Sequence, residues 1–259
     1  MRMAGQKMKN NYKKYLEIGR ELFCSLLFPK RCPVCDEILE PEEVKKGIHS
    51  TCESKIYPIQ GAVCMHCGRP VGNINPEYCY DCIQKGYHKK SYITQAKALY
   101  LYKGAIKKTM YRFKYSNKRE YADFFAKRAL EAYEIWMHRI GAEAIVPVPM
   151  YKKKQNKRGY NQAECFARAL SRYMGVPVVT DLVYRVIDTT PQKELDAKQR
   201  KNNLKKAFHG KKNVVQYNCI IVVDDIYTTG STAEAVAWEL LKQGAQRVYL
   251  MTICIGEHI

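Results

Sequence analysis

Two acidic residues followed by a hydroxyl-rich stretch carry the most distinctive chemistry of this sequence. Asp224 and Asp225, the acidic pair, come directly after four apolar residues. A short stretch follows that we call the phosphate loop: Thr228, Thr229, Gly230, Ser231 and Thr232. Backbone N–H groups in such a loop, together with the positive end of a following helix, bind phosphate, and Gly230 permits close approach. Neighbouring carboxylates suit ribose hydroxyls, or a magnesium ion bridging sugar and pyrophosphate.

A strand must precede these residues and a helix must follow them. Residues 220–223 are apolar and β-branched throughout, which is typical of a buried strand in a parallel sheet. Residues 233–243 favour a helix, with Gly244 as its stop. Other segments extend this pattern: strands at 144–149, 178–185 and 247–255, and helices at 121–140 and 161–174. The sequence therefore predicts an α/β domain with a parallel sheet, which the strand at 247–255 closes.

A second anion site is predicted after the strand at 144–149. The sequence continues as YKKKQNKRGYNQ, a basic loop that ends at the start of the next helix. Lys157, Arg158 and Gly159 stand nearest to that helix. Because the positive end of that helix attracts anions, these three residues are candidate phosphate-binding residues.

Cysteine pairs dominate residues 32–82. Four pairs of potential ligands are each separated by two residues, the spacing of zinc-binding turns. The economical assignment is two zinc ions, one on the first cluster (Cys32, Cys35, His49 and Cys52) and one on the second cluster (Cys64, Cys67, Cys79 and Cys82). Free or redox-active cysteines are the alternative. His66 and His88 are expected on the surface.

Basic and aromatic residues alternate between residues 98 and 121. Tyr111, Arg112, Phe113 and Lys114 form the densest part of this segment. Rings that stack on bases and cations that meet phosphates suit single-stranded nucleic acid. The alternative is a strand entering a helix, with the aromatic residues in the core and the lysines in solvent.

The overall charge agrees with a polyanionic partner. The chain has 259 residues and a formal net charge of +19, with basic residues spread throughout. No apolar run approaches the length of a membrane span, and no signal peptide is recognisable. The sequence predicts a cytoplasmic protein, which we expect near the inner face of the membrane. Residues 1–30 are expected to form a basic amphipathic helix that docks on the next module rather than on a membrane.

Residues 220–232 resemble the phosphoribosyl-pyrophosphate motif of type I phosphoribosyltransferases. The cysteine pairs, the KGAIKKTMYRFKY segment and PVP followed by RGYNQA extend this resemblance to the ComF family. Further shared positions are Arg185, Gln192, Leu195, Arg200, Asn203 and Phe208. His49 is the one departure, because it stands where a cysteine would complete the pattern.

The resemblance implies a double zinc ribbon at residues 31–90 and a phosphoribosyltransferase-like domain at 91–259. It also implies a flexible flap at 186–208 and pyrophosphate held at Lys157 and Arg158. The expected role is DNA uptake during natural transformation, with phosphoribosyl pyrophosphate, magnesium, single-stranded DNA and proteins of the uptake machinery as partners. Two functions stay open. The chain either binds these ligands or transfers ribose 5-phosphate to an acceptor, with Asp224 and Asp225 stabilising charge at the ribose C1.

Overall fold

A computed structural model describes residues 29–72, 77–187, 207–210 and 216–257. The chain divides into two compact units, Met1–Lys55 and Ile56–Ile259. The first cysteine cluster lies in the first unit, and the second cluster lies in the same unit as the sheet. The division therefore falls after residue 55, whereas the sequence placed a boundary after residue 90. The predicted N-terminal helix and most of the predicted flap lie outside the described residues.

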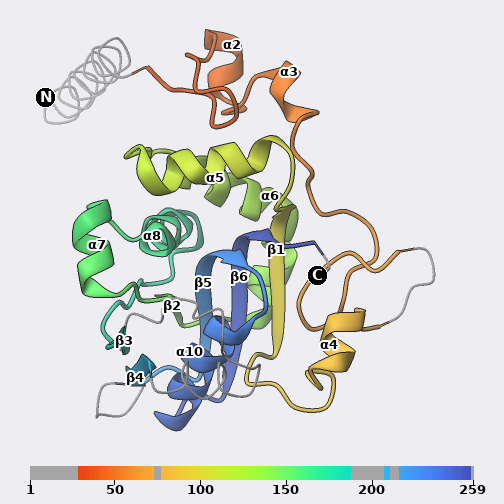
Figure 1. Cartoon of the computed structure of the whole chain (residues 1–259), viewed down its shortest axis with the longest axis vertical. Helices are drawn as coiled ribbons and strands as arrows, with labels where there is room; N and C mark the ends of the chain where they lie inside the picture. Colours follow the sequence, from red (N-terminus) through yellow and green to blue (C-terminus); the bar gives the residue numbers. More distant parts are fainter. Residues whose placement is uncertain (1–28, 73–76, 188–206, 211–215, 258–259) are drawn as a thin grey trace, which may run out of the picture. The chain divides into compact units, whose positions relative to one another are not determined.

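Four parallel strands form the sheet of the second unit: β1 (Gln95–Leu101), β2 (Ala144–Pro147), β5 (Cys219–Tyr227) and β6 (Arg247–Ile255). Their order is β1-β6-β5-β2 (Figure 1). The predicted parallel sheet is confirmed. Two details were wrong. β6 lies inside the sheet rather than closing it, because β1 pairs along its outer side. β5 also continues past its apolar residues, so that Asp224 still pairs with Thr252 of β6.

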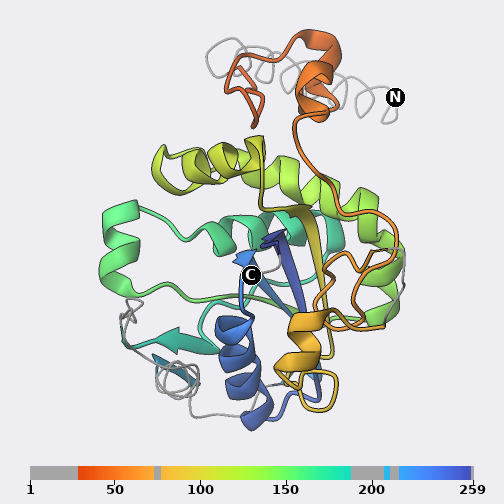
Figure 2. The same ribbon diagram turned by 45° about the vertical axis from the view of Figure 1, so that its right-hand side comes forward.

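Helices cover both faces of this sheet (Figures 1 and 2). α6 (Tyr121–Ile140) packs on α8 (Gln162–Met174), and α8 packs on β2 and β5. α10 (Ser231–Lys242) packs on β5 and β6. Alternate strand residues share one core with α10, namely Val146, Ile220, Val222, Val248 and Leu250. Because side chains alternate along a strand, the residues between them face the α8 side, and both faces of the sheet are apolar.

The helices predicted at 121–140 and 161–174 are confirmed as α6 and α8. Asn161 precedes α8, and its side-chain oxygen accepts a hydrogen bond from the Ala163 N–H at 3.1 Å. This capping contact satisfies one of the N–H groups that a helix leaves unpaired at its start. The Asn161 amide also donates to the carbonyl of Val148 at 2.9 Å, which ties the start of α8 to the chain just after β2.

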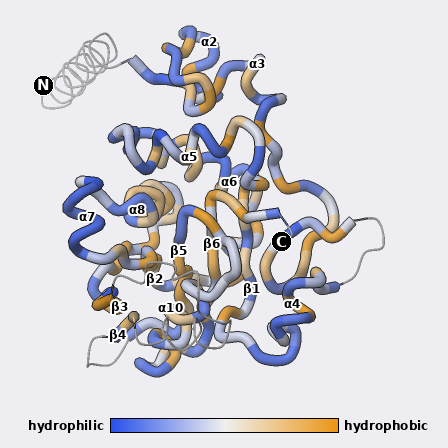
Figure 3. Tube along the Cα trace, viewed as in Figure 1, coloured by the Kyte–Doolittle hydropathy of each residue, from blue (hydrophilic) through white to orange (hydrophobic). Residues whose placement is uncertain are grey.

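Two predicted segments fold differently. Residues 152–158, expected as a loop, form α7 (Lys152–Arg158), which is hydrophilic along its length (Figure 3). Lysine, glutamine and arginine are good helix formers, which accounts for the difference. The strand predicted at 178–185 is broken at Asp181, a residue that strands disfavour. Val178 bridges to Ile145 in parallel, whereas β3 (Val183–Arg185) pairs antiparallel with β4 (Phe208–Gly210).

Four further helices complete the described chain. α2 (Pro41–Val44) and α3 (Ser50–Glu53) belong to the first unit, and α4 (Tyr80–Gln84) and α5 (Ala105–Tyr115) to the second. α3 follows directly after His49 and α4 directly after Cys79, so each begins at a predicted metal ligand. Within the described ranges, no helix combines the length and apolar character needed to cross a bilayer.

Candidate functional site

The acidic pair lies near the carboxyl end of β5, as a parallel sheet with a ligand site at that end requires. The Asp225 N–H donates to Asp224 Oδ1 at 2.8 Å, which turns the first carboxylate back toward the strand. Burial, followed by repulsion from Asp225, raises the pKa of Asp224 to about 7. Aspartate residues whose pKa is shifted in this way are common in functional sites.

Lys114 forms an ion pair with this acidic pair. Its Nζ lies 2.9 Å from Asp225 Oδ2, and both side chains are largely buried. Burial lowers the pKa of Lys114, but the attraction of Asp225 and Asp224 outweighs burial and raises it. The charge of Arg185, at the end of β3, also acts on Asp224. Neither role was predictable from the sequence, because the contacts join segments more than 35 positions apart in the chain.

The phosphate loop connects β5 to α10 as predicted. Gly230 has φ of +80° and ψ of −10°, the left-handed conformation that favours glycine. A Cβ at this position would lie 2.3 Å from the hydroxyl of Tyr227. Thr229 Oγ1 lies 3.1 Å from Ser231 Oγ and accepts a bond from the Ser231 N–H at 3.4 Å. The loop is therefore tightly turned over Tyr227, the last residue of β5.

A small cavity lies at the base of this loop. Its volume is about 20 Å³, which is room for about one water molecule. Asp224 and four residues of the phosphate loop line it: Thr228, Gly230, Ser231 and Thr232. The structure therefore brings one member of the acidic pair and most of the loop to a common space, as the sequence predicted.

Arg158, the last residue of α7, contacts α5 and α8. Its guanidinium lies 4.8 Å from the ring centre of Tyr115 and donates to the Tyr115 hydroxyl at 3.1 Å. It also donates to Gln162 Oε1 at 2.8 Å. Arg158 contributes to the electrostatic environment of Lys114, whereas Lys157 is exposed and has no such contact among the described residues. Gly159 ends α7 in a left-handed conformation.

The four predicted nucleic-acid residues separate by helix face. Tyr111 is 62% exposed, whereas Phe113 is fully buried beside Phe125. Phe113 therefore belongs to the core and is unavailable to stack on a base. The reason is the helical period, because Ile106 and Met110 share its buried face. Arg112 is partly buried, and Lys114 is paired with Asp225. Tyr115, another aromatic residue of the same segment, is 58% exposed, and its ring centre lies 4.9 Å from that of Tyr111.

The second cluster has the geometry of a zinc site. The sulfur atoms of Cys64, Cys67, Cys79 and Cys82 lie within 4.8 Å of one another, and all four residues are buried. Cys67 Sγ and Cys79 Sγ are 3.6 Å apart. A tetrahedral zinc with bonds of about 2.3 Å separates its sulfur ligands by about 3.8 Å, so this donor set fits zinc.

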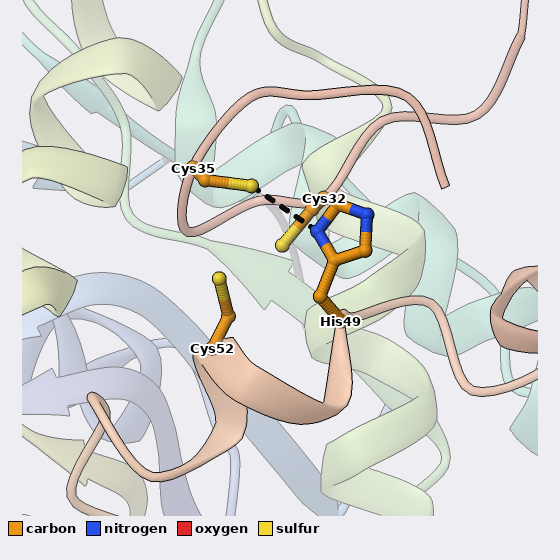
Figure 4. A group of neighbouring side chains, drawn as sticks. All are labelled: Cys32, Cys35, His49 and Cys52. Carbon is orange, nitrogen blue, oxygen red and sulfur yellow. Dashed lines mark hydrogen bonds between the residues drawn. The ribbon is translucent and has the colours of Figure 1, made fainter. Parts of the chain in front are cut away.

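The first cluster also gathers its four predicted ligands (Figure 4). Cys35 Sγ lies 3.2 Å from His49 Nδ1, and His49 Nε2 lies 3.0 Å from the carbonyl of Ile38. A proton on Nε2 would donate to that carbonyl and leave the Nδ1 lone pair for a metal, the usual arrangement of ligating histidines. His49 therefore fits as the fourth ligand of Cys32, Cys35 and Cys52.

The expected surface position of His66 is wrong. This residue is 4% exposed and stacks on Tyr87, with ring centres 4.9 Å apart. Its Nε2 lies 2.7 Å from Ser91 Oγ, and its Nδ1 lies 3.4 Å from Cys82 Sγ. The sequence carries no local signal for this burial, because the partners come from 16 and 25 positions further along the chain. His88 is partly buried, and its ring centre lies 6.0 Å from the ring centre of Tyr78.

We predict two zinc ions per chain in protein purified without a chelator. Elemental analysis should give a ratio near two, and Cys79→Ala or Cys52→Ala should reduce it to about one, because each removes a ligand of one cluster. Cys165→Ala is the matched control, since Cys165 lies outside both clusters. A ratio near zero in the unmodified chain, with disulfides found by mass spectrometry, would contradict the prediction.

Known proteins resemble this chain over most of its length. The double zinc ribbon domain family matches residues 23–83. Competence protein F of Haemophilus influenzae is 32% identical over 212 residues, which cover 79% of this chain and 88% of that protein. DNA utilization protein YhgH of Escherichia coli K12 is 30% identical over a region that covers 80% of this chain and 90% of that protein. Competence protein ComFC of Bacillus subtilis is 28% identical over a region that covers 80% of this chain and 82% of that protein.

Among solved structures, a purine phosphoribosyltransferase from Pyrococcus horikoshii matches with a TM-score of 0.31 and 16% identity, over 50% of this chain and 72% of that chain. A score this low carries no argument about the site. The relatives, by contrast, match about four fifths of this chain and about nine tenths of their own length. The chain belongs to the ComF family.

Proposed function

We propose that this chain binds phosphoribosyl pyrophosphate, or a related nucleotide phosphate, together with single-stranded DNA, and acts in DNA uptake. The ion pair between Lys114 and Asp225 carries this proposal. Lys114 belongs to the basic helix α5, and Asp225 belongs to the acidic pair beside the phosphate loop. One contact therefore joins the two surfaces whose chemistry suits DNA and a sugar phosphate. The names of the relatives, competence protein F and DNA utilization protein, favour the same process.

The phosphate side of the proposal uses the loop and the acidic pair. The loop N–H groups and the N-terminus of α10 would hold the 5′-phosphate. Asp224 and Asp225 would hold the ribose hydroxyls, or a magnesium ion that bridges ribose and pyrophosphate. Lys157 and Arg158 would neutralise the pyrophosphate, with Gly159 allowing the turn into the next helix.

The DNA side of the proposal uses the exposed face of α5 and the first residues of α7. Tyr111 and Tyr115 present rings to solvent, and Arg158 stacks on Tyr115. α7 adds three exposed lysines: Lys152, Lys153 and Lys154. Stacked rings flanked by cations bind single strands without sequence preference, because every base offers a π face and every nucleotide a phosphate.

Single-stranded DNA should therefore bind more tightly than duplex. Tyr111→Ala and Tyr115→Ala should each weaken single-strand binding by about 1 kcal/mol and leave its salt dependence unchanged, because stacking releases no counterions. Lys154→Ala should reduce the slope of log affinity against log salt. Fluorescence anisotropy with a labelled oligonucleotide at several salt concentrations measures both effects.

Tyr184→Ala is the matched control, since Tyr184 is 49% exposed but lies on β3 beside His209 rather than on α5. Equal affinity for duplex and single strand, or equal losses in all three tyrosine variants, would count against base stacking on α5.

A second function, transfer of ribose 5-phosphate to an acceptor, is favoured by the intact acidic pair. In this reading Asp224 and Asp225 stabilise the positive charge that develops at the ribose C1 as pyrophosphate leaves. Nothing among the described residues identifies a base-recognition site. A pyrophosphate-release assay separates the two functions. Binding without release supports the first, and steady release with an added nucleophile supports the second.

A further inference from the structure

The peptides of a phosphate loop carry N–H groups on one side and carbonyl groups on the other, and both sides need partners. If its N–H groups face an anion, the carbonyl groups of the same peptides face away and need donors of their own. Two cations approach those carbonyls. Arg69 Nη2 donates to the carbonyl of Thr228, and Lys85 Nζ donates to the carbonyl of Thr229, each at 3.4 Å. These contacts are long for hydrogen bonds, so the attraction is mainly between a cation and a carbonyl dipole.

Both cations lie within three residues of a cysteine of the second cluster along the chain. Arg69 comes two residues after Cys67 and is only 2% exposed. Its guanidinium pairs with Asp81, which stands between Cys79 and Cys82. Lys85 follows α4, the helix that starts at Cys79. A metal that fixes the four sulfur atoms would therefore fix the positions of Arg69 and Lys85.

The cluster is also bonded directly to the sheet. The Ala96 N–H of β1 donates to the carbonyl of His66 at 2.7 Å. Gly68 has φ of +75°, and a Cβ at this position would lie 2.8 Å from the carbonyl oxygen of Ala96. The turn between Cys67 and Arg69 therefore lies against the backbone of β1, which leaves Arg69 little freedom to move relative to the sheet.

A second connection reaches the first turn of α10, just after the phosphate loop. Glu234 is 6% exposed and accepts hydrogen bonds from Ser91 Oγ and from the Tyr92 N–H, the latter at 2.9 Å. Ser91 Oγ also contacts His66 Nε2 at 2.7 Å. The start of α10 is thus held by Ser91 and Tyr92, which lie between the second cluster and β1 in the chain, and the preceding loop is contacted by Arg69 and Lys85.

We infer that the second zinc ribbon positions the phosphate loop, with Arg69 as the main positioning residue and Lys85 as its companion. The zinc would hold the two cysteine turns together without touching the ligand, and the two cations would orient the peptides of Thr228 and Thr229. This inference rests on the proposed function only where it predicts an effect on phosphate binding. The effect on the loop itself can be measured without any ligand.

Hydrogen exchange of peptides covering residues 226–233 tests the inference. Arg69→Met should speed exchange of the loop amides by about tenfold, the scale of one lost charge-assisted contact. Arg69→Lys should have a smaller effect, because it keeps the charge. Zinc content should stay near two in both variants, and the dissociation constant for phosphoribosyl pyrophosphate should rise by about tenfold in Arg69→Met. Arg172→Met is the matched control, since Arg172 also pairs with an aspartate, Asp123, but on α6.

Lys85→Met keeps the test decisive if Arg69→Met fails to fold, because Lys85 is exposed. Loop exchange at the unmodified rate in Lys85→Met, and also in Arg69→Met where that variant folds, would overturn the inference. Unmodified loop exchange in Cys79→Ala, which empties the second cluster, would overturn it too. If the unmodified chain fails to bind phosphoribosyl pyrophosphate, the proposed function is wrong, and the exchange comparison still decides the role of the ribbon.

Discussion

Gly230→Val is expected to abolish binding of phosphoribosyl pyrophosphate. The residue has φ of +80°, which a β-branched side chain adopts only with strain. Its Cβ would also lie 2.3 Å from the Tyr227 hydroxyl and 2.7 Å from the adjacent ring carbon. Tyr227 is 5% exposed and cannot swing into solvent, so the loop must move instead. A displaced loop no longer directs its N–H groups at one point. Isothermal titration calorimetry measures the loss.

Gly175→Val is the matched control for this variant. Gly175 has φ of +67°, so valine suffers similar backbone strain there, but no heavy atom lies within 4 Å of the added Cβ. The control should lose stability and keep its affinity for phosphoribosyl pyrophosphate. Thermal melting of both variants shows whether each still folds. Wild-type affinity in a folded Gly230→Val protein would show that the loop has no part in binding.

Asp224→Asn is expected to stabilise the protein at pH 8. Burial and Asp225 raise the pKa of Asp224 to about 7, against about 4 for an aspartate in an unfolded chain. Between these values the folded state holds a proton that the unfolded state has released. The favourable contribution is therefore complete below about pH 4 and is lost as the pH rises through about 7. Asparagine cannot ionise, yet its oxygen can still accept the bond from the Asp225 N–H.

The expected difference is about 2–4 kcal/mol in the free energy of unfolding between Asp224→Asn and wild type at pH 8, shrinking toward pH 4. Urea unfolding at pH 5 and pH 8 measures it. Asp123→Asn, an exposed aspartate paired with Arg172, should show no such change. The same variant of Asp224 should bind phosphoribosyl pyrophosphate with magnesium more weakly by about 1–3 kcal/mol. Identical pH dependence in wild type and Asp224→Asn would show that the pKa of Asp224 is not raised in the folded protein.

Segments whose chemistry is local were predicted well from the sequence. The strand, loop and helix around Gly230 depend on neighbours along the chain, and they occur as expected. The cysteine clusters were predictable because a two-residue spacing places both ligands of a turn on one metal. For residues 98–121 the sequence left two interpretations open, and the one with aromatic residues in the core holds for Phe113, which follows Ile106 and Met110 at helical spacing. It does not hold for Tyr111, which is exposed.

Contacts between distant segments were not predictable. Arg69 and Thr228 are 159 positions apart, and nothing near either residue indicates the other. The same holds for Lys114 and Asp225, whose pairing depends on how α5 lies over the end of β5. The interior position of β6 was missed because hydrophobic pattern shows that a strand is buried but not which strands are its neighbours.

Calorimetric titration of phosphoribosyl pyrophosphate into the full-length, zinc-loaded protein, with and without magnesium, is the decisive test of the proposed phosphate site. We expect one binding site per chain, with higher affinity in the presence of magnesium, that is absent from Gly230→Val but retained in Gly175→Val. Single-stranded DNA added beforehand should change the affinity, because Lys114 of α5 and Asp225 of the acidic pair are bonded to each other. No detectable binding at millimolar ligand, or binding that Gly230→Val leaves unchanged, would contradict the proposed phosphate site.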